Sequence, residues 1–264
     1  MVTIPTHTRE LFTNLVRREV RGRYKGSALG VVWTLVTPFI MMLAYTLVFS
    51  VLFQFVDERL PNYPLYLLTG LALWLFFAGA LNVSATSLIA NANLVKKVRF
   101  PRFIVPVAAV VSQSLTMIVM IAVLIPFSVF LMPGDPVVML LLPVIMIPIV
   151  MMVVGAALAV SVLNVYFRDI EHIIAALLLP WFFLTPVLFS FDTFPLATEH
   201  VWLVDVLQLV NFVTPFMIAF QDVLYWGLVP GWRIWTYIFV VGPAMLLGGH
   251  LIFRRMQRNL AVEL

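Results

Sequence analysis

Four long apolar runs dominate the chain, over about residues 31–55, 64–90, 103–131 and 137–166, and none contains a charged residue or a histidine. Each run is long enough to cross the ~30 Å hydrocarbon core of a bilayer as a helix. Only 11% of the residues are charged, against about 25% in soluble domains, which is too few to cover a water-exposed surface. The sequence therefore excludes a soluble enzyme and predicts an all-α polytopic membrane protein.

Two further apolar segments bring the expected number of transmembrane helices to six. The fifth span begins near Ile173 and is interrupted by Pro180 and Pro186. The sixth covers about residues 232–253 and is followed by a basic tail. We expect the six spans to form the core of one transmembrane domain that includes the whole chain.

One more apolar stretch, 216–228, is too short to be a seventh crossing. Between Pro215 and Pro230 it offers only about thirteen residues, or ~20 Å of helix. A crossing there would also move the basic tail to the other side of the membrane. We therefore expect residues 191–231 to form re-entrant or interfacial helices on the outer face, between spans five and six. Such backbone is tolerated at membrane depth only when protein buries it or it lines a cavity.

The basic residues predict the orientation of the spans. With six spans and both termini in the cytoplasm, 14 of the 16 Lys and Arg residues lie on the cytoplasmic side, and only Arg59 and Arg233 lie outside. This bias agrees with the positive-inside rule. It also accounts for the net charge of +4 without a nucleic-acid partner.

The N-terminal segment, 8–26, has the pattern of a basic amphipathic helix. Leu11, Leu15 and Val16 belong to an apolar stripe at helical spacing, and arginines flank the other face. Such a helix is expected to lie along the cytoplasmic membrane surface, in contact with lipid. The expected domain thus consists of this helix, the six-span core 31–253 and a cytoplasmic tail, 254–264.

Several kinds of energy-converting or catalytic site are missing from the sequence. The first four spans lack the ionisable groups with which secondary transporters and pumps bind a coupling ion. The chain has no glycine-rich phosphate loop followed by Gly-Lys-Ser/Thr, no paired histidines at metal-ligand spacing and no cysteine. We expect no metal or cofactor in this chain. Uphill transport would therefore take its energy from a partner.

Aromatic residues, at 14% of the chain, are the first group of candidate site residues. Rings on a channel wall suit sugars, whose C–H faces pack on aromatic rings while their hydroxyls stay hydrated. A lipid-facing stripe is the simpler interpretation for any single ring. The candidates for a channel lining are Tyr45, Phe49, Phe53, Trp74, Phe77, Trp181 and Phe182.

Two short charged connections between spans are the second group. In one interpretation, these connections bind a cytoplasmic ATPase and convert its closure into helix movement. In the other, they are ordinary positive-inside loops that are exposed to solvent. The candidate coupling residues are Lys96, Lys97, Arg99, Arg102, Arg168, Asp169 and Glu171. Polar side chains inside the spans, Ser112, Gln113, Thr116 and Asn164 among them, are expected to hydrogen-bond between helices.

Ordered motifs along nearly the whole chain resemble the permease subunits of polysaccharide ABC exporters, of the Wzm-type O-antigen and TagG-type teichoic-acid and capsule kinds. They are the run from Arg21 to Trp33 (RGRYKGSALGVVW), Lys97–Pro101 (KVRFP), Asn164–Ile170 (NVYFRDI) and Thr185–Val187 (TPV). The ordered combination is specific, whereas no single piece would be.

This resemblance implies a homodimeric permease of the bacterial inner membrane, bound to two copies of a separate ATPase subunit that holds ATP and Mg²⁺. The N-terminal helix would meet the ATPase, and spans one, two and five would line a channel. The substrate would be a polyprenyl-diphosphate-linked polysaccharide or a polyol-phosphate polymer. The candidate residues at the cytoplasmic mouth of the channel are Arg21, Arg23, Lys25, Leu29 and Gly30.

Two other functions are compatible with the sequence. An ABC permease could instead export drugs or other small hydrophobic molecules. A membrane-embedded transferase acting on lipid-linked sugar would need acids at a membrane face, and the close pairs are Asp57 with Glu58 and Asp169 with Glu171. Neither pair belongs to a known catalytic motif.

Overall fold

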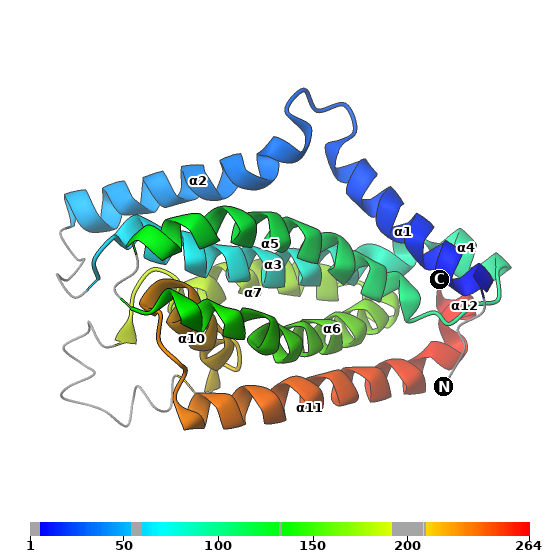
Figure 1. The fold of residues 1–264 in the computed structure, drawn as a ribbon. Coiled ribbons are helices and arrows are strands. Elements are labelled where there is room, and N and C mark those ends of the chain that lie inside the picture. Colours follow the sequence, from blue (N-terminus) through cyan, green and yellow to red (C-terminus); the bar gives the residue numbers. More distant parts are fainter. Residues whose placement is uncertain (1–5, 54–59, 132–133, 192–207, 209) are drawn as a thin grey trace.

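The computed structural model describes residues 6–53, 60–131, 134–191, 208 and 210–264, and all regular structure within these ranges is helical (Figure 1). The elements are α1 (Thr6–Tyr24), η1 (Gly30–Val32), α2 (Trp33–Tyr45), η2 (Thr46–Leu52), α3 (Tyr63–Ala90), α4 (Ala92–Lys97), α5 (Ile104–Leu131), η3 (Pro136–Leu141), α6 (Leu142–Tyr166), α7 (Ile170–Leu184), α10 (Thr214–Gln221), η5 (Asp222–Trp226), α11 (Trp232–Met256), η6 (Gln257–Asn259) and α12 (Leu260–Glu263).

Five of the six predicted spans correspond to described helices that are long and apolar enough to cross a membrane. Their bounds lie close to those expected from the sequence, and α3 and α5 end at the predicted residues. The five are Trp33–Leu52, Tyr63–Ala90, Ile104–Leu131, Pro136–Tyr166 and Trp232–Asn259.

The fifth predicted span is shorter than expected, because α7 has only 15 residues. At 1.5 Å per residue this is about 22 Å, less than the ~30 Å core of a bilayer. Pro180 lies inside α7 without ending it, whereas Thr185 adopts an extended conformation (φ −100°, ψ 140°). A residue that precedes proline is disfavoured in the helical region, so Pro186 ends the helix. The chain continues as a buried non-helical segment from Thr185 to Leu188.

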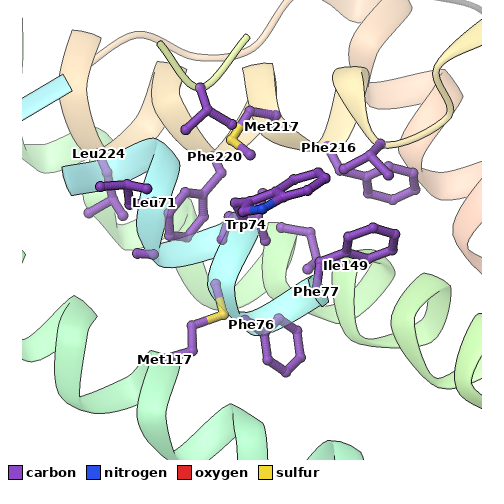
Figure 2. Packing of buried hydrophobic residues seen from close by; sticks show 14 of the residues in the cluster. Leu71, Trp74, Phe76, Phe77, Met117, Ile149, Phe216, Met217, Phe220 and Leu224 are labelled. Atoms are coloured by element: carbon purple, nitrogen blue, oxygen red, sulfur yellow. The ribbon is translucent and has the colours of Figure 1, made fainter. Parts of the chain in front are cut away.

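Helix α3 is the centre of the bundle and packs against α2, α5, α6, α7 and α10. Its most apolar 18-residue stretch is 83% buried, whereas the corresponding stretch of Trp33–Leu52 is only 6% buried. Figure 2 shows Leu71, Trp74 and Phe77 of α3 packed among apolar side chains of the neighbouring helices. A helix that is apolar on every side can be buried in this way.

The amphipathic helix α1 ends before Gly26, which has a φ of 80° that glycine adopts readily. Its apolar stripe packs on the chain itself, and its place along the membrane surface stays a prediction. Leu15 is buried in a cluster with Ile104, Leu158 and Phe253, and Leu11, Phe12 and Val16 pack against the same cluster. Figure 1 shows α1, α4 and α12 at one end of the bundle, which we call the basic end.

The described part of the predicted re-entrant region is a short inserted helix, α10 continued by η5. Phe216, Phe220 and Tyr225 are fully buried, and the segment packs against α3, α6 and α11. It ends at Gly227, whose φ is 61°. The segment has thirteen residues, ten of them buried, which agrees with a segment that does not cross by itself. Most of the preceding stretch, 192–207 and 209, lies outside the described residues, so the re-entrant hairpin stays a prediction.

Helices α6 and α11 make a close backbone contact through glycines. A Cβ atom built on Gly249 would lie 1.9 Å from the carbonyl oxygen of Gly155, and one built on Gly155 would lie 2.2 Å from that of Met245. Small residues at such crossings let membrane helices approach until their backbones touch. The adjacent Gly248 has open space at the corresponding position.

We therefore expect Gly249→Ala to lower the free energy of unfolding by about 2 kcal/mol or more, because the methyl group forces α6 and α11 apart. The matched control is Gly248→Ala, whose methyl group meets nothing and whose effect should lie within about 1 kcal/mol of zero. The measurement is reversible unfolding in detergent micelles. Equal stability of the two variants would contradict the close backbone contact.

Candidate functional site

The aromatic candidates form one connected group of rings where α2, η2, α3 and α7 meet. Ring centroids of Tyr45 and Phe182 are 5.6 Å apart, those of Trp74 and Phe182 are 5.5 Å apart, and those of Phe77 and Trp181 are 5.3 Å apart. The helices that carry them correspond to the first, second and fifth predicted spans. The seven rings thus come together in space although the sequence separates them by up to 137 positions.

The same rings differ in exposure. Trp74, Phe77 and Phe182 are 5%, 0% and 3% exposed, so the chain itself covers them. A lining role for these three requires the surrounding helices to part. Phe53 is 67% exposed, and Tyr45, Phe49 and Trp181 are partly exposed. Burial divides the predicted group into a core set and a surface set.

Asn211 fixes the end of α7 next to this aromatic group. The Trp181 indole nitrogen donates to Asn211 Oδ1 at 2.8 Å, and Asn211 Nδ2 donates to the hydroxyl of Thr185 at 2.9 Å. The nearby Tyr225 hydroxyl donates to the carbonyl oxygen of Pro61. Burial raises the pKa of Tyr225, which keeps this phenol a donor. No signal in the sequence indicated the role of Asn211.

The coupling candidates lie at the basic end, in the connections that follow α3 and α6. Lys96, Lys97 and Arg99 are exposed and available to another protein. Arg102 has a different position, because its guanidinium donates to the carbonyl oxygen of Gln257. It therefore ties the connection before α5 to the C-terminal segment.

In the second connection, the backbone around Glu171 is held by a buried asparagine. Asn164 Nδ2 donates to the carbonyl oxygen of Ala85 at 2.9 Å, and Asn164 Oδ1 accepts from the backbone N–H of Glu171 at 3.0 Å. Arg168 and Asp169 project from this connection and are exposed. The predicted interhelical role of Asn164 is confirmed, and it fixes the connection to α3.

The candidate mouth residues surround the turn that joins α1 to α2. The Ser27 hydroxyl accepts from the backbone N–H of Gly30 at 3.1 Å, and Gly30 has a φ of 51°. Leu29 is 49% exposed at the apex. Arg21, Arg23 and Lys25 lie just before the turn and are also exposed on the chain surface. The five residues are thus brought together locally by their position in sequence.

Comparison with known families identifies the chain. The model of the family described as ABC-2 type transporter matches residues 10–225, from α1 to the end of the inserted helix. The chain belongs to the ABC-2 type transporter family. It is therefore a transport permease subunit.

Three curated relatives share this ABC-2 permease architecture along nearly their whole length. Each is named O-antigen export system permease protein RfbA. The Myxococcus xanthus protein is 28% identical over 253 residues, which cover 96% of this chain and 95% of that protein. Two Klebsiella pneumoniae proteins are 28% and 26% identical over 254 residues, covering 96% of this chain and 94% of each relative. The predicted resemblance to O-antigen permeases is confirmed.

The acid pairs considered for a transferase do not gather into a larger site in the described part of the permease. Asp169 is exposed, and the carboxylate of Glu171 lies 3.7 Å from the imidazole of His172. Among the described residues, no three His, Cys, Asp or Glu side chains come close enough to hold a metal ion. Asp57 and Glu58 lie outside the described residues.

We expect Asn164→Leu to loosen the connection after α6, because the substitution leaves the buried carbonyl of Ala85 and the N–H of Glu171 without their partner. The cost should be about 1–3 kcal/mol. Hydrogen–deuterium exchange at residues 168–172 should become faster in this permease variant. Asn82→Leu, on an exposed position of α3, is the matched control and should leave that exchange unchanged. Unchanged exchange in Asn164→Leu would contradict the anchoring role.

Proposed function

We propose that the chain is the membrane subunit of an ATP-driven exporter for lipid-linked polysaccharide of the O-antigen kind. The observation that carries this proposal is similarity over 96% of the chain to three permeases whose names state O-antigen export. The composition agrees with it, because the first four apolar spans hold no charged side chain or histidine and the chain has no phosphate loop. A permease that moves such a polymer needs energy from a partner ATPase and a channel wall along which sugars can pass.

In this proposal two copies of the chain form the channel and two copies of an ABC ATPase bind at the basic end. The basic end then faces the cytoplasm of a bacterium, in agreement with the positive-inside rule, and the inserted helix α10 lies toward the outer face. The exposed residues Lys96, Lys97, Arg99, Arg168 and Asp169 are the proposed contacts for the ATPase. Arg102 and Glu171 support these contacts from within the permease.

The exposed face of α2 and η2 is the proposed channel wall. Leu43, Leu47 and Val51 are between 54% and 64% exposed in the single chain. Phe53 and the partly exposed Tyr45 and Phe49 lie on the same span, and Tyr45 contacts the α7 ring of Phe182. A second copy facing this span would enclose an aromatic-lined path between the two chains.

The direct test of the proposal is purification of the chain with the ABC ATPase encoded beside it. We expect a stable complex with two copies of each subunit, and ATP hydrolysis that responds to the lipid-linked polysaccharide. Failure of the two proteins to associate would contradict the proposal. Intact surface polysaccharide combined with raised drug sensitivity in a deletion strain would favour the drug-export alternative.

Charge reversal should separate ATP hydrolysis from export. We expect the triple variant Lys96→Glu, Lys97→Glu and Arg99→Glu, and separately Arg168→Glu, to reduce export at least about fivefold while hydrolysis continues and membrane insertion is normal. Export can be followed by surface polysaccharide and hydrolysis by phosphate release. The control is Arg233→Glu, an exposed cation at the far end of α11. Normal export in both test variants would contradict the proposal that these connections couple ATP hydrolysis to helix movement.

Removal of the rings on the first span should impair polymer passage. We expect combined alanine substitution of Tyr45, Phe49 and Phe53 to lower export about fivefold or more, because aromatic contacts contribute of the order of 1 kcal/mol each. The matched control is alanine at Trp232 and Trp235, which lie on α11 away from the proposed wall. Equal effects of the two variants would indicate that the first-span rings face lipid.

A further inference from the structure

A cavity of about 520 Å³ lies between the α1–α2 turn, the first part of α2 and the middle of α3 and α5. Its volume is within the range of small-ligand sites, roughly 300–1,000 Å³. The polar side chains on its wall are Arg23, Ser27, Thr34, Thr37, Gln113 and Thr116. Trp33, Pro38 and Leu75 supply an apolar part. The cavity is therefore amphipathic, with one cation among hydroxyl and amide groups.

Arg23 supplies that cation and is oriented by α5. Its Nη1 donates to the Thr116 hydroxyl at 2.9 Å, and its Nη2 lies 3.5 Å from the Ser112 hydroxyl. Both partners are neutral, and no carboxylate lines the cavity among the described residues. A guanidinium has five N–H donors, so most of them remain available to an anion. The position is thus a fixed positive charge without a balancing negative charge.

The depth of this position makes the unbalanced charge significant. Gln113 and Thr116 stand nine and twelve residues after the start of α5, or about 14–18 Å along the helix. The α5 wall of the cavity therefore lies within the apolar length of this span and not at its end. Charged side chains at membrane depth are expensive unless they are paired, and they mark functional paths.

Gln113 is an independent sign that this cavity takes a polar ligand. The residue is 8% exposed, and its side chain lines the wall of the cavity. Gly79 of α3 leaves room for this amide, since a Cβ atom there would lie 2.9 Å from Gln113 Oε1. A side-chain amide offers both donors and an acceptor, so its position on the cavity wall suits a ligand with hydrogen-bonding groups.

We propose that this cavity binds the phosphoryl headgroup of a lipid, with Arg23 holding the phosphate charge and Gln113 hydrogen-bonding the oxygen atoms beside it. Arginine pairs with phosphate through short, charge-assisted hydrogen bonds. Trp33, Pro38 and Leu75 would contact the first carbons of the lipid chain. The inference that this lipid is the transported diphosphate-linked substrate rests on the proposed function. A bilayer phospholipid offers the same phosphate chemistry.

The test measures lipid binding to the full-length permease in detergent by native mass spectrometry. The probes are a polyprenyl diphosphate, the matching polyprenol without phosphate, and phosphatidylglycerol. We expect the diphosphate to bind at least about tenfold more tightly than the polyprenol. Arg23→Gln and Gln113→Leu should each remove about tenfold of that affinity. Arg17→Gln, at an exposed arginine of α1 that does not line the cavity, should change affinity less than twofold.

The outcomes separate the two lipid sources and the two proposals. Preference for the diphosphate assigns the site to substrate, and equal, Arg23-dependent binding of phosphatidylglycerol assigns it to a bilayer lipid. Unchanged diphosphate binding in both variants would contradict the proposed binding site. Binding of the polyprenol as tight as that of the diphosphate would contradict it as well. If Gln113→Leu does not fold, Gln113→Met replaces it. Failure to pair with an ATPase would overturn the proposed function but leave this binding result unaffected.

Discussion

The apolar contacts around α3 hold the rest of the bundle in place. A helix with no polar face can exist in this position only if other helices surround it, and α2, α5, α6, α7 and α10 do so. The inserted helix α10 reaches the interior because Phe216, Met217 and Phe220 pack against it (Figure 2). The basic connections after α3 and α6 are brought to the same end by this packing. Movement of the ATPase contacts would therefore be transmitted to α3 and its neighbours first.

The polar contacts are few and lie where the helices end. Asn164 links the connection after α6 to Ala85, and Arg102 links the connection before α5 to Gln257. Asn62 Nδ2 donates to the carbonyl oxygen of Leu131 at 2.9 Å, at the opposite end of α5. Hydrogen bonds at helix ends fix the connections, whereas the middle sections of the helices pack mainly through apolar side chains. This arrangement suits helices that slide or tilt as units.

The long apolar runs in the sequence predicted the spans close to their observed bounds, because hydrocarbon thickness sets the length of a span and polar residues mark its ends. The sequence did not predict whether a given apolar side chain packs against the chain, lines a channel or contacts lipid. Trp74 and Phe77 lie on a helix that is apolar all round, so no periodicity distinguishes a buried ring from a channel-facing one. The apolar stripe of α1 has the same ambiguity, since Leu15 would be stable against lipid or against the chain. The sequence predicted interruptions of the fifth span at Pro180 and Pro186, but only Pro186 ends α7, because Pro180 lies within the helix.

The candidate site was predictable to a similar extent. The basic connections were found because charge between long apolar runs stands out, but the sequence did not distinguish exposed Lys96 from Arg102, which is committed to Gln257. Gln113 and Thr116 were expected to bond between helices, and Thr116 accepts from Arg23 whereas the Gln113 amide faces a cavity. These distinctions depend on tertiary contacts between residues about 90 positions apart, which local patterns do not encode.

The central claim is that this permease has no energy source of its own, because its first four spans hold no charged side chain or histidine and its sequence has no phosphate loop. The most direct measurement is transport of lipid-linked polysaccharide in sealed proteoliposomes, followed by an added glycosidase that reaches only one leaflet. We predict polymer translocation only when the partner ATPase and ATP are both present. Accumulation against a gradient by the lone polypeptide would contradict the claim.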